Sequence, residues 1–184
     1  MAIWASNVHA QDAIERIRAR YTEIKQCIAS MSEEDGMPPV YYQIYISQNL
    51  PGTGKHVEDI RMYYDEDEAD EDVIYPPHQL ALITSSYNFA IRKYYEEYLF
   101  NKDGTIAFIY ARNPDISDEK EYEFRFYFDK KKLIKAIIKN RKFDDNEFVE
   151  EQTVKTIPPA YESFLQSCLQ AAEKYRNMFF AIDR

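Results

Sequence analysis

Glycine, histidine and cysteine are all scarce in this sequence. Its 184 residues include 4 glycines, 3 histidines and 2 cysteines. So few glycines argue against a glycine-rich cofactor fold, which needs several tight turns between strand and helix. The histidines occur singly and show neither an HxH nor an HExxH spacing, so the sequence predicts no metal site. No cofactor is expected either.

Long apolar runs and an excess of positive charge are also missing. No apolar run approaches the roughly 20 residues of a membrane-spanning helix. The net charge of −9 disfavours a nucleic-acid partner, which requires clustered Lys and Arg against phosphate. One basic run, residues 130–142, alternates lysines with aliphatic residues. This run predicts a strand with one solvated face, or an edge strand protected by its lysines.

Aromatic residues are abundant, with 16 Tyr and 11 Phe, and they favour the pleated surface of a sheet. Residues 120–129 alternate aromatic and polar side chains cleanly, as a strand does. Residues 90–99 fit a strand but also fit one face of a helix, and both alternatives stay open. Gly104 is expected at positive φ in the turn that follows. The expected strands are 40–47, 57–64, 79–87, 89–100, 105–112, 120–129 and 132–140.

Two segments at the ends of the chain read as amphipathic helices. Residues 12–31 and 159–180 carry apolar side chains at helical spacing, with charges opposite. The acidic run 65–72 and the polar segment 141–152 are expected to be loops. The fold prediction is α+β: a single antiparallel meander sheet covered on one face by both helices, as a two-layer sandwich.

The stretch PGTGK, residues 51–55, resembles a phosphate-binding loop. That motif needs a glycine at position 49 and a Ser or Thr at position 56. The chain has Asn49 and His56 there, and the residues that follow alternate as a strand rather than starting a helix. The stretch therefore predicts a hairpin turn and not a nucleotide site.

The N-terminal residues suggest export. A short apolar run ends in Val8, His9 and Ala10, which fits a signal-peptidase cleavage site. We expect residues 1–10 to be the end of a signal peptide, residues 11–184 to form one domain, and the protein to be periplasmic, cell-surface or secreted. The alternative is a frayed terminus before a helix. In an exported protein Cys27 and Cys168 can form a disulfide, whereas in a cytosolic one they would be buried thiols.

No catalytic constellation stands out. The chain has no G-x-S-x-G elbow, and neither cysteine has a neighbouring activator in the sequence. Glu96 and Glu97 are adjacent in a strand-like run, so they point to opposite faces and cannot act on one bond. They are expected to be solvated or salt-bridged. We assign no catalytic residue.

Tyr and Phe occupy both parities of several predicted strands. Outward rings beside charged side chains suit a binding surface, although cross-strand aromatic pairing on a wet face would give the same pattern. The weak candidate binding residues are Tyr95, Tyr127, Arg125 and His56.

One segment carries a resemblance. Glu96 to Phe100, Asp103-Gly104 and Arg125 to Phe128 form a strand-turn-strand pattern, and residues 94–137 resemble uncharacterised exported bacterial α+β proteins. The resemblance implies export and an antiparallel sheet, and it carries no activity or site.

These observations lead to two functional hypotheses. The first is an exported binding or interaction module without catalytic activity, whose partner is an unknown protein or a small extracellular ligand. The alternative is a hydrolase-type enzyme that uses His56 or His78 with carboxylates, in a pocket that the sequence does not show.

Overall fold

The computed structural model describes residues 2–30, 40–66 and 78–183. Its elements are α1 (Ala2–Ser30), β1 (Tyr41–Leu50), β2 (Gly54–Glu66), β3 (His78–Phe89), β4 (Arg92–Phe100), β5 (Ile106–Asp115), β6 (Lys120–Asp129), β7 (Lys132–Lys142), β8 (Val149–Val154) and α2 (Pro159–Ile182). Most of the acidic run 65–72, which is predicted to be a loop, lies outside the described residues.

The eight strands form one sheet in which each strand pairs with the next along the chain. Their order is β1 to β8 without a crossover, and every pair is antiparallel. The α+β class and the antiparallel meander are therefore confirmed, and residues 92–100 are a strand rather than a helix. One row of facing residues crosses six strands: Met62, Ile83, Tyr98, Ile109, Phe126 and Ala136.

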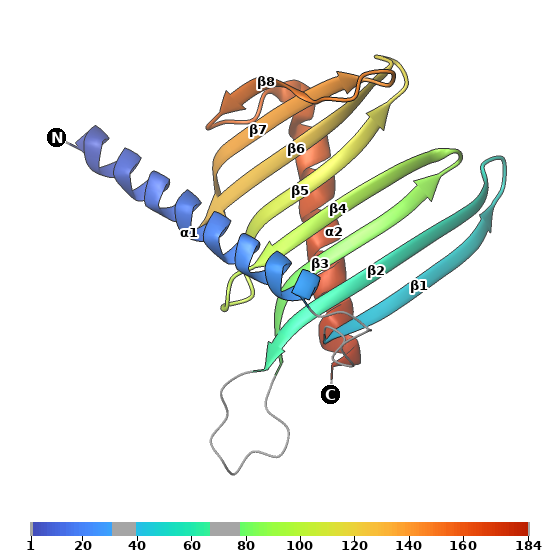
Figure 1. The fold of residues 1–184 in the computed structure, drawn as a ribbon, viewed down its shortest axis with the longest axis horizontal. Coiled ribbons are helices and arrows are strands. Elements are labelled where there is room, and N and C mark those ends of the chain that lie inside the picture. The colour runs from blue at the N-terminus through green and yellow to red at the C-terminus, as the bar shows by residue number, and fades with distance from the viewer. Residues whose placement is uncertain (1, 31–39, 67–77, 184) are drawn as a thin grey trace, which may run out of the picture.

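The two helices lie on opposite faces of this sheet. Ile14 and Ile17 of α1 pack in one apolar cluster with Leu99 and Phe108. The buried residues of α2 pack in a second cluster, with Tyr98 and strand residues of the other parity. Figure 1 shows α1 crossing in front of the strands and α2 running behind them. We call these the α1 face and the α2 face.

The predicted coverage of a single face is therefore wrong. Strands that are buried on both sides do not alternate between apolar and polar residues. Leu99 and Phe100, adjacent in β4, are 0% and 2% exposed although they point to different helices. The aromatic residues on both parities reflect two cores rather than one core and one wet face.

The predicted loop 141–152 is also partly wrong, because β8 runs from Val149 to Val154. It pairs with β7 through Ala136–Val154 and Ile138–Gln152. The basic strand β7 is thus not an edge, since β8 covers it. The sequence of β8, VEEQTV, has little of the apolar–polar alternation that marks a half-buried strand, while its polar residues suit a protected edge.

The predicted hairpin turn between β1 and β2 is confirmed. The Thr53 amide donates to the Leu50 carbonyl at 3.2 Å, and Gly52 and Gly54 have φ of 81° and 82°. β2 starts at Gly54, and Lys55 already pairs with Asn49 across the hairpin. A strand therefore follows PGTGK where a phosphate-binding loop needs a helix.

Gly104 has the expected positive φ, 75°, and a Cβ placed there would lie 3.3 Å from Arg176 Nε. Gly104→Ala is expected to lower the free energy of unfolding by about 1–2 kcal/mol, because a side chain is strained in this region. Gly52→Ala is a matched control, with φ of 81° and no atom within 4 Å of its added Cβ. Urea unfolding should show the larger loss for Gly104→Ala. A smaller loss than for Gly52→Ala would contradict the packing of Arg176 on this turn.

The two cysteines are separated by the sheet. Cys27 lies on α1 and is exposed, Cys168 lies on α2 and is buried, and both are free. Because the helices cover opposite faces, these thiols do not meet within one chain. None of the helices in the described ranges is both long and apolar enough to span a membrane.

Candidate functional site: a cleft between the sheet and α2

A cleft of about 420 Å³ opens between α2 and one end of strands β2 to β5. Such a volume is within the range of small-ligand sites. The strands contribute the start of β2, the end of β3, the start of β4 and the end of β5. The lining residues are His56, Glu58, Tyr87, Tyr94, Glu96, Asn113, Phe164, Ser167, Cys168, Ala171, Lys174 and Tyr175.

Two buried carboxylates form the floor of this cleft. Glu58 on β2 and Glu96 on β4 are each 7% exposed. Facing pairs in the register put both on the α2 face: Ser85 opposes Glu96, and Tyr87 opposes Glu58. Neither carboxylate has an ion pair with a Lys or Arg among the described residues. Buried like charges without an ion pair are costly, so their burial needs an explanation.

Tyrosine hydroxyls hold both carboxylates in place. The Tyr175 hydroxyl donates to Glu58 Oε1 at 2.5 Å, and Ser85 Oγ lies 3.3 Å from the same oxygen. The Tyr87 hydroxyl donates to Glu96 Oε1 at 2.8 Å, and Tyr98 donates to Glu96 Oε2. Burial raises the pKa of all three phenols, and their carboxylate partners raise it further. These hydroxyls therefore stay protonated and act as donors.

The proton affinity of Glu96 is unusual. Burial raises the pKa of its carboxyl above the ordinary value, and the charge of Glu58 raises it further. The hydrogen bonds from Tyr98 and Tyr87 act against this rise, as does Lys174. Perturbed carboxyls in a cleft are common at functional sites.

This shift predicts a pH dependence of stability. A carboxyl whose pKa is raised by folding stabilises the fold at pH below its unfolded pKa of about 4.3, and that contribution is lost as pH rises through the folded pKa. The substitution Glu96→Gln replaces this carboxyl with an amide, which does not titrate. We expect the stability of Glu96→Gln relative to wild type to increase from about pH 4 to about pH 7. Chemical denaturation across this range measures it, and a constant difference would contradict the raised pKa.

His56 lines the cleft with a defined orientation. Its Nδ1 is 2.5 Å from the backbone carbonyl oxygen of Asn88. Because a carbonyl only accepts, Nδ1 carries the proton, and in the neutral ring Nε2 is an acceptor. His78 lies elsewhere, with Nδ1 2.5 Å from Asp183 at the end of α2. The cleft therefore contains His56 and not His78.

Aromatic rings make up much of the cleft wall. Tyr87 and Tyr94 stack with centroids 4.9 Å apart and planes 4° apart. The ammonium of Lys174 lies 5.0 Å from the ring centroid of Tyr175. The Cys168 thiol is 2% exposed, and burial raises its pKa, so it is protonated and a poor nucleophile. The cleft combines acceptors and π faces, both of which attract cations.

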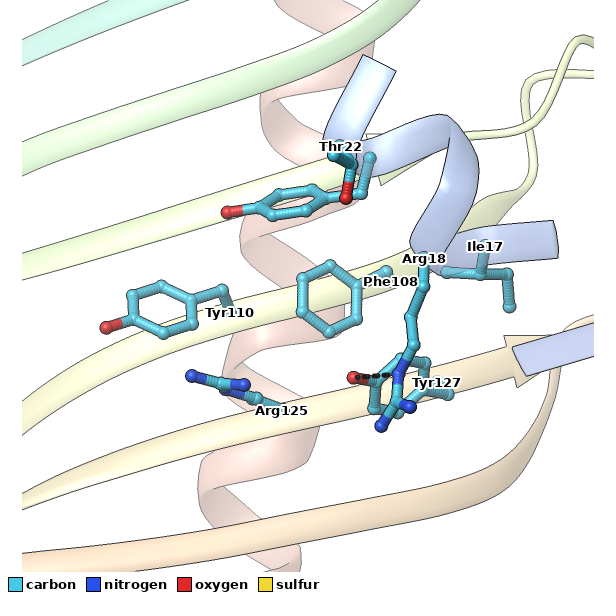
Figure 2. A pocket seen from close by; sticks show the side chains of 8 residues that line it. Ile17, Arg18, Thr22, Phe108, Tyr110, Arg125 and Tyr127 are labelled. Atoms are coloured by element: carbon cyan, nitrogen blue, oxygen red, sulfur yellow. Dashed lines mark hydrogen bonds between the residues drawn. The ribbon is translucent and has the colours of Figure 1, made fainter. Parts of the chain in front are cut away.

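The other predicted binding residues lie on the opposite face. Tyr95, Arg125 and Tyr127 are on the α1 face. Tyr127 is 3% exposed, because α1 covers it and Arg18 Nε lies 3.4 Å from its hydroxyl (Figure 2). The prediction that Tyr127 points outward is therefore wrong. Tyr127 and Arg125 line one pocket there, whereas His56 is not near them.

The adjacent glutamates of β4 point to opposite faces, as predicted. Glu97, 3% exposed, accepts hydrogen bonds from Tyr21 and Tyr95 and pairs with the Lys25 ammonium at 2.9 Å. Its expected salt bridge is confirmed, and it joins α1 to the sheet. Glu96 is neither solvated nor salt-bridged, so that expectation is wrong for Glu96. No sequence pattern pointed to Glu58, whose main donor, Tyr175, is 117 residues away.

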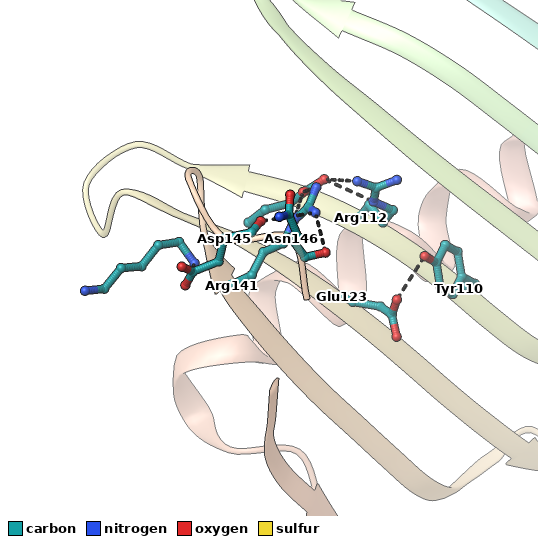
Figure 3. Close-up of polar contacts among 8 residues, drawn as sticks. Tyr110, Arg112, Glu123, Arg141, Asp145 and Asn146 are labelled. Atoms are coloured by element: carbon teal, nitrogen blue, oxygen red, sulfur yellow. Dashed lines mark hydrogen bonds and ion pairs between the residues drawn. The ribbon is translucent and has the colours of Figure 1, made fainter. Parts of the chain in front are cut away.

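The α1 face also carries an arginine network. Arg112 and Arg141 both bind Glu121, at 2.7 and 2.5 Å, and Arg141 also lies 3.3 Å from the Asn146 carbonyl. Figure 3 shows these contacts beside the hydrogen bond from Tyr110 to Glu123. These two arginines are occupied within the protein.

We found no matching protein-family model, no matching curated protein and no matching solved structure for this chain. The cleft is therefore interpreted from its own chemistry. Its distinctive feature is a pair of buried carboxylates, fixed by neutral hydroxyls and bordered by aromatic rings.

Proposed function

We propose that the protein is an exported binding module whose α2 cleft takes a ligand with primary ammonium groups. The observation that carries this proposal is the pair Glu58 and Glu96, both 7% exposed and without a Lys or Arg ion pair among the described residues. A bound ammonium relieves the repulsion between the two carboxylates and donates to their oxygens. The rings of Tyr87, Tyr94 and Tyr175 add cation–π attraction.

The ligand class follows from the donors and acceptors. A primary ammonium has three N–H donors, which suits carboxylates that already accept from tyrosine. The cleft volume of about 420 Å³ fits a small molecule or a single side chain. A diamine matches the two carboxylates best, because each end can pair with one of them.

Calorimetric titration with 1,4-diaminobutane tests the proposal, with butane-1,4-diol as a neutral control of the same length. We expect the diamine to bind and to raise the melting temperature, and the diol to do neither. Because the chain carries a net charge of −9, non-specific attraction of the diamine to the protein surface must be distinguished from binding in the cleft. Binding that is equal in wild type and Glu58→Gln would sink the proposal.

One observation favours the alternative, a hydrolase. His56 lines the same cleft as Glu58 and Glu96, and its Nδ1–H bond to Asn88 leaves Nε2 for a water or a substrate. Burial raises the pKa of the Glu96 carboxyl, which suits a general acid. Turnover of a chromogenic ester or glycoside that is lost in both His56→Gln and Glu96→Gln would support this alternative over simple binding.

Export remains part of the proposal and rests on Val8, His9 and Ala10. All side chains of α1 that are described as buried, from Ala13 onward, lie beyond Ala10 and would be kept after cleavage there. Intact mass of the protein from its host measures this. A mature chain that starts at Gln11 is the expected result, and one that starts at Met1 would contradict export by this signal.

A further inference from the structure

A second pocket, of about 320 Å³, lies between α1 and the strands β5 and β6 on the α1 face. Figure 2 shows Phe108 in its centre, with Arg18 and Arg125 on its sides. The pocket is on the opposite side of the sheet from the α2 cleft. It is lined by Ile17, Arg18, Tyr21, Thr22, Phe108, Tyr110, Arg125 and Tyr127.

Both guanidinium groups keep free donors. Arg18 bonds through Nε to the Tyr127 hydroxyl at 3.4 Å and has no carboxylate partner among the described residues. Arg125 pairs with Glu123 at 2.9 Å, and its Nε is buried without a hydrogen-bond partner in the described part of the chain. An unpaired buried donor is costly, and an anion in the pocket would satisfy it.

The charge balance sets the class of anion. Arg18 and Arg125 supply two positive charges, and Glu123 offsets one of them. Lys25 and Glu97 nearby form a pair of their own. The net charge at the pocket is thus one positive unit, which matches a monovalent carboxylate better than a doubly charged phosphate.

The rest of the lining determines the body of the ligand. Phe108 and Ile17 present apolar surface, and the rings of Tyr21 and Phe108 lie 5.2 Å apart at 65°. The Tyr127 hydroxyl accepts from Arg18, so its own proton remains available to an anion. A planar carboxylate can engage a guanidinium with two parallel bonds. We propose that this pocket binds a carboxylate carried on a ring-sized apolar body.

Nuclear magnetic resonance titration with benzoate tests this proposal on the full chain. We expect benzoate to shift the resonances of the pocket residues, and the isosteric neutral benzamide to leave them in place. Arg18→Gln and Arg125→Gln should each weaken benzoate binding about tenfold or more. Arg18→Lys keeps the charge but loses the planar fork, so we expect an intermediate affinity.

Arg16→Gln is the matched control, because Arg16 lies on the same helix and does not line the pocket; its affinity should equal that of wild type. Equal binding of benzamide, or undiminished benzoate binding in Arg18→Gln and Arg125→Gln, would overturn the site. Tighter binding of phenyl phosphate than of benzoate would overturn the assignment to a carboxylate. Glu58→Gln should leave benzoate binding unchanged, since the two pockets are on opposite faces.

Discussion

The double variant Glu58→Gln/Glu96→Gln should lose affinity for 1,4-diaminobutane by about 100-fold or more while keeping or gaining stability. Each charged hydrogen bond to an ammonium contributes about 1.5–3 kcal/mol, and two are removed. The amide oxygens still accept from Tyr175 and Tyr87, the amide NH2 that replaces Glu96 Oε2 can donate to the Tyr98 oxygen, and two buried like charges disappear. Opposite effects on binding and stability mark residues that are retained for function.

Calorimetry and urea unfolding of the same preparations measure both quantities. Glu162→Gln is the matched control, because Glu162 is an exposed acidic residue on α2 and its loss changes the net charge without touching the cleft. Its diamine affinity should stay within about twofold of wild type, since the charge is screened by salt. A large loss of stability in the double variant, with diamine affinity retained, would assign both carboxylates to the fold instead.

Glu97→Ala is expected to cost about 3 kcal/mol of stability and to loosen α1 selectively. The change leaves the Tyr21 and Tyr95 hydroxyls and the Lys25 ammonium without their shared acceptor, and unpaired buried groups cost about 1–3 kcal/mol each. Lys25 is 39% exposed and can turn to water, which limits the loss. Tyr21 and Lys25 both belong to α1, so that helix loses its polar attachment to β4.

Amide hydrogen exchange shows which helix loses stability in Glu97→Ala. Amides of α1 between Ala13 and Ile28 should exchange faster in Glu97→Ala, while those of α2 keep their protection. Glu23→Ala, an exposed position on the same helix, should behave like wild type. Uniform acceleration in both helices would show that Glu97 stabilises the whole fold rather than the docking of α1.

The order of the strands could be predicted because local signals repeat along the chain. Alternation in β6, the turn glycines at 52 and 104, and the helical spacing in α2 each depend on neighbouring residues only. The placement of α1 depends on distant contacts. Nothing in residues 2–30 specifies which face of the sheet Ile14 and Ile17 will cover.

The candidate site was harder to predict for the same reason. Period-2 geometry separates Glu96 from Glu97 correctly, yet it says nothing about their burial. Glu96 is buried because α2, more than 60 residues later, covers that end of the sheet. Glu58 becomes a site residue through Tyr175, and a single sequence shows no link between positions so far apart.

The most direct test of the central claim is a carbon-13 titration of the glutamate side-chain carboxyls with and without 1,4-diaminobutane. The account predicts a raised pKa for Glu96 in the free protein, as its burial beside Glu58 requires. It also predicts that the diamine lowers this pKa and shifts the carboxyl resonances of Glu58 and Glu96, because a bound cation favours the ionised forms. Two carboxyl resonances that stay unmoved throughout the diamine titration would contradict an ammonium site in the α2 cleft.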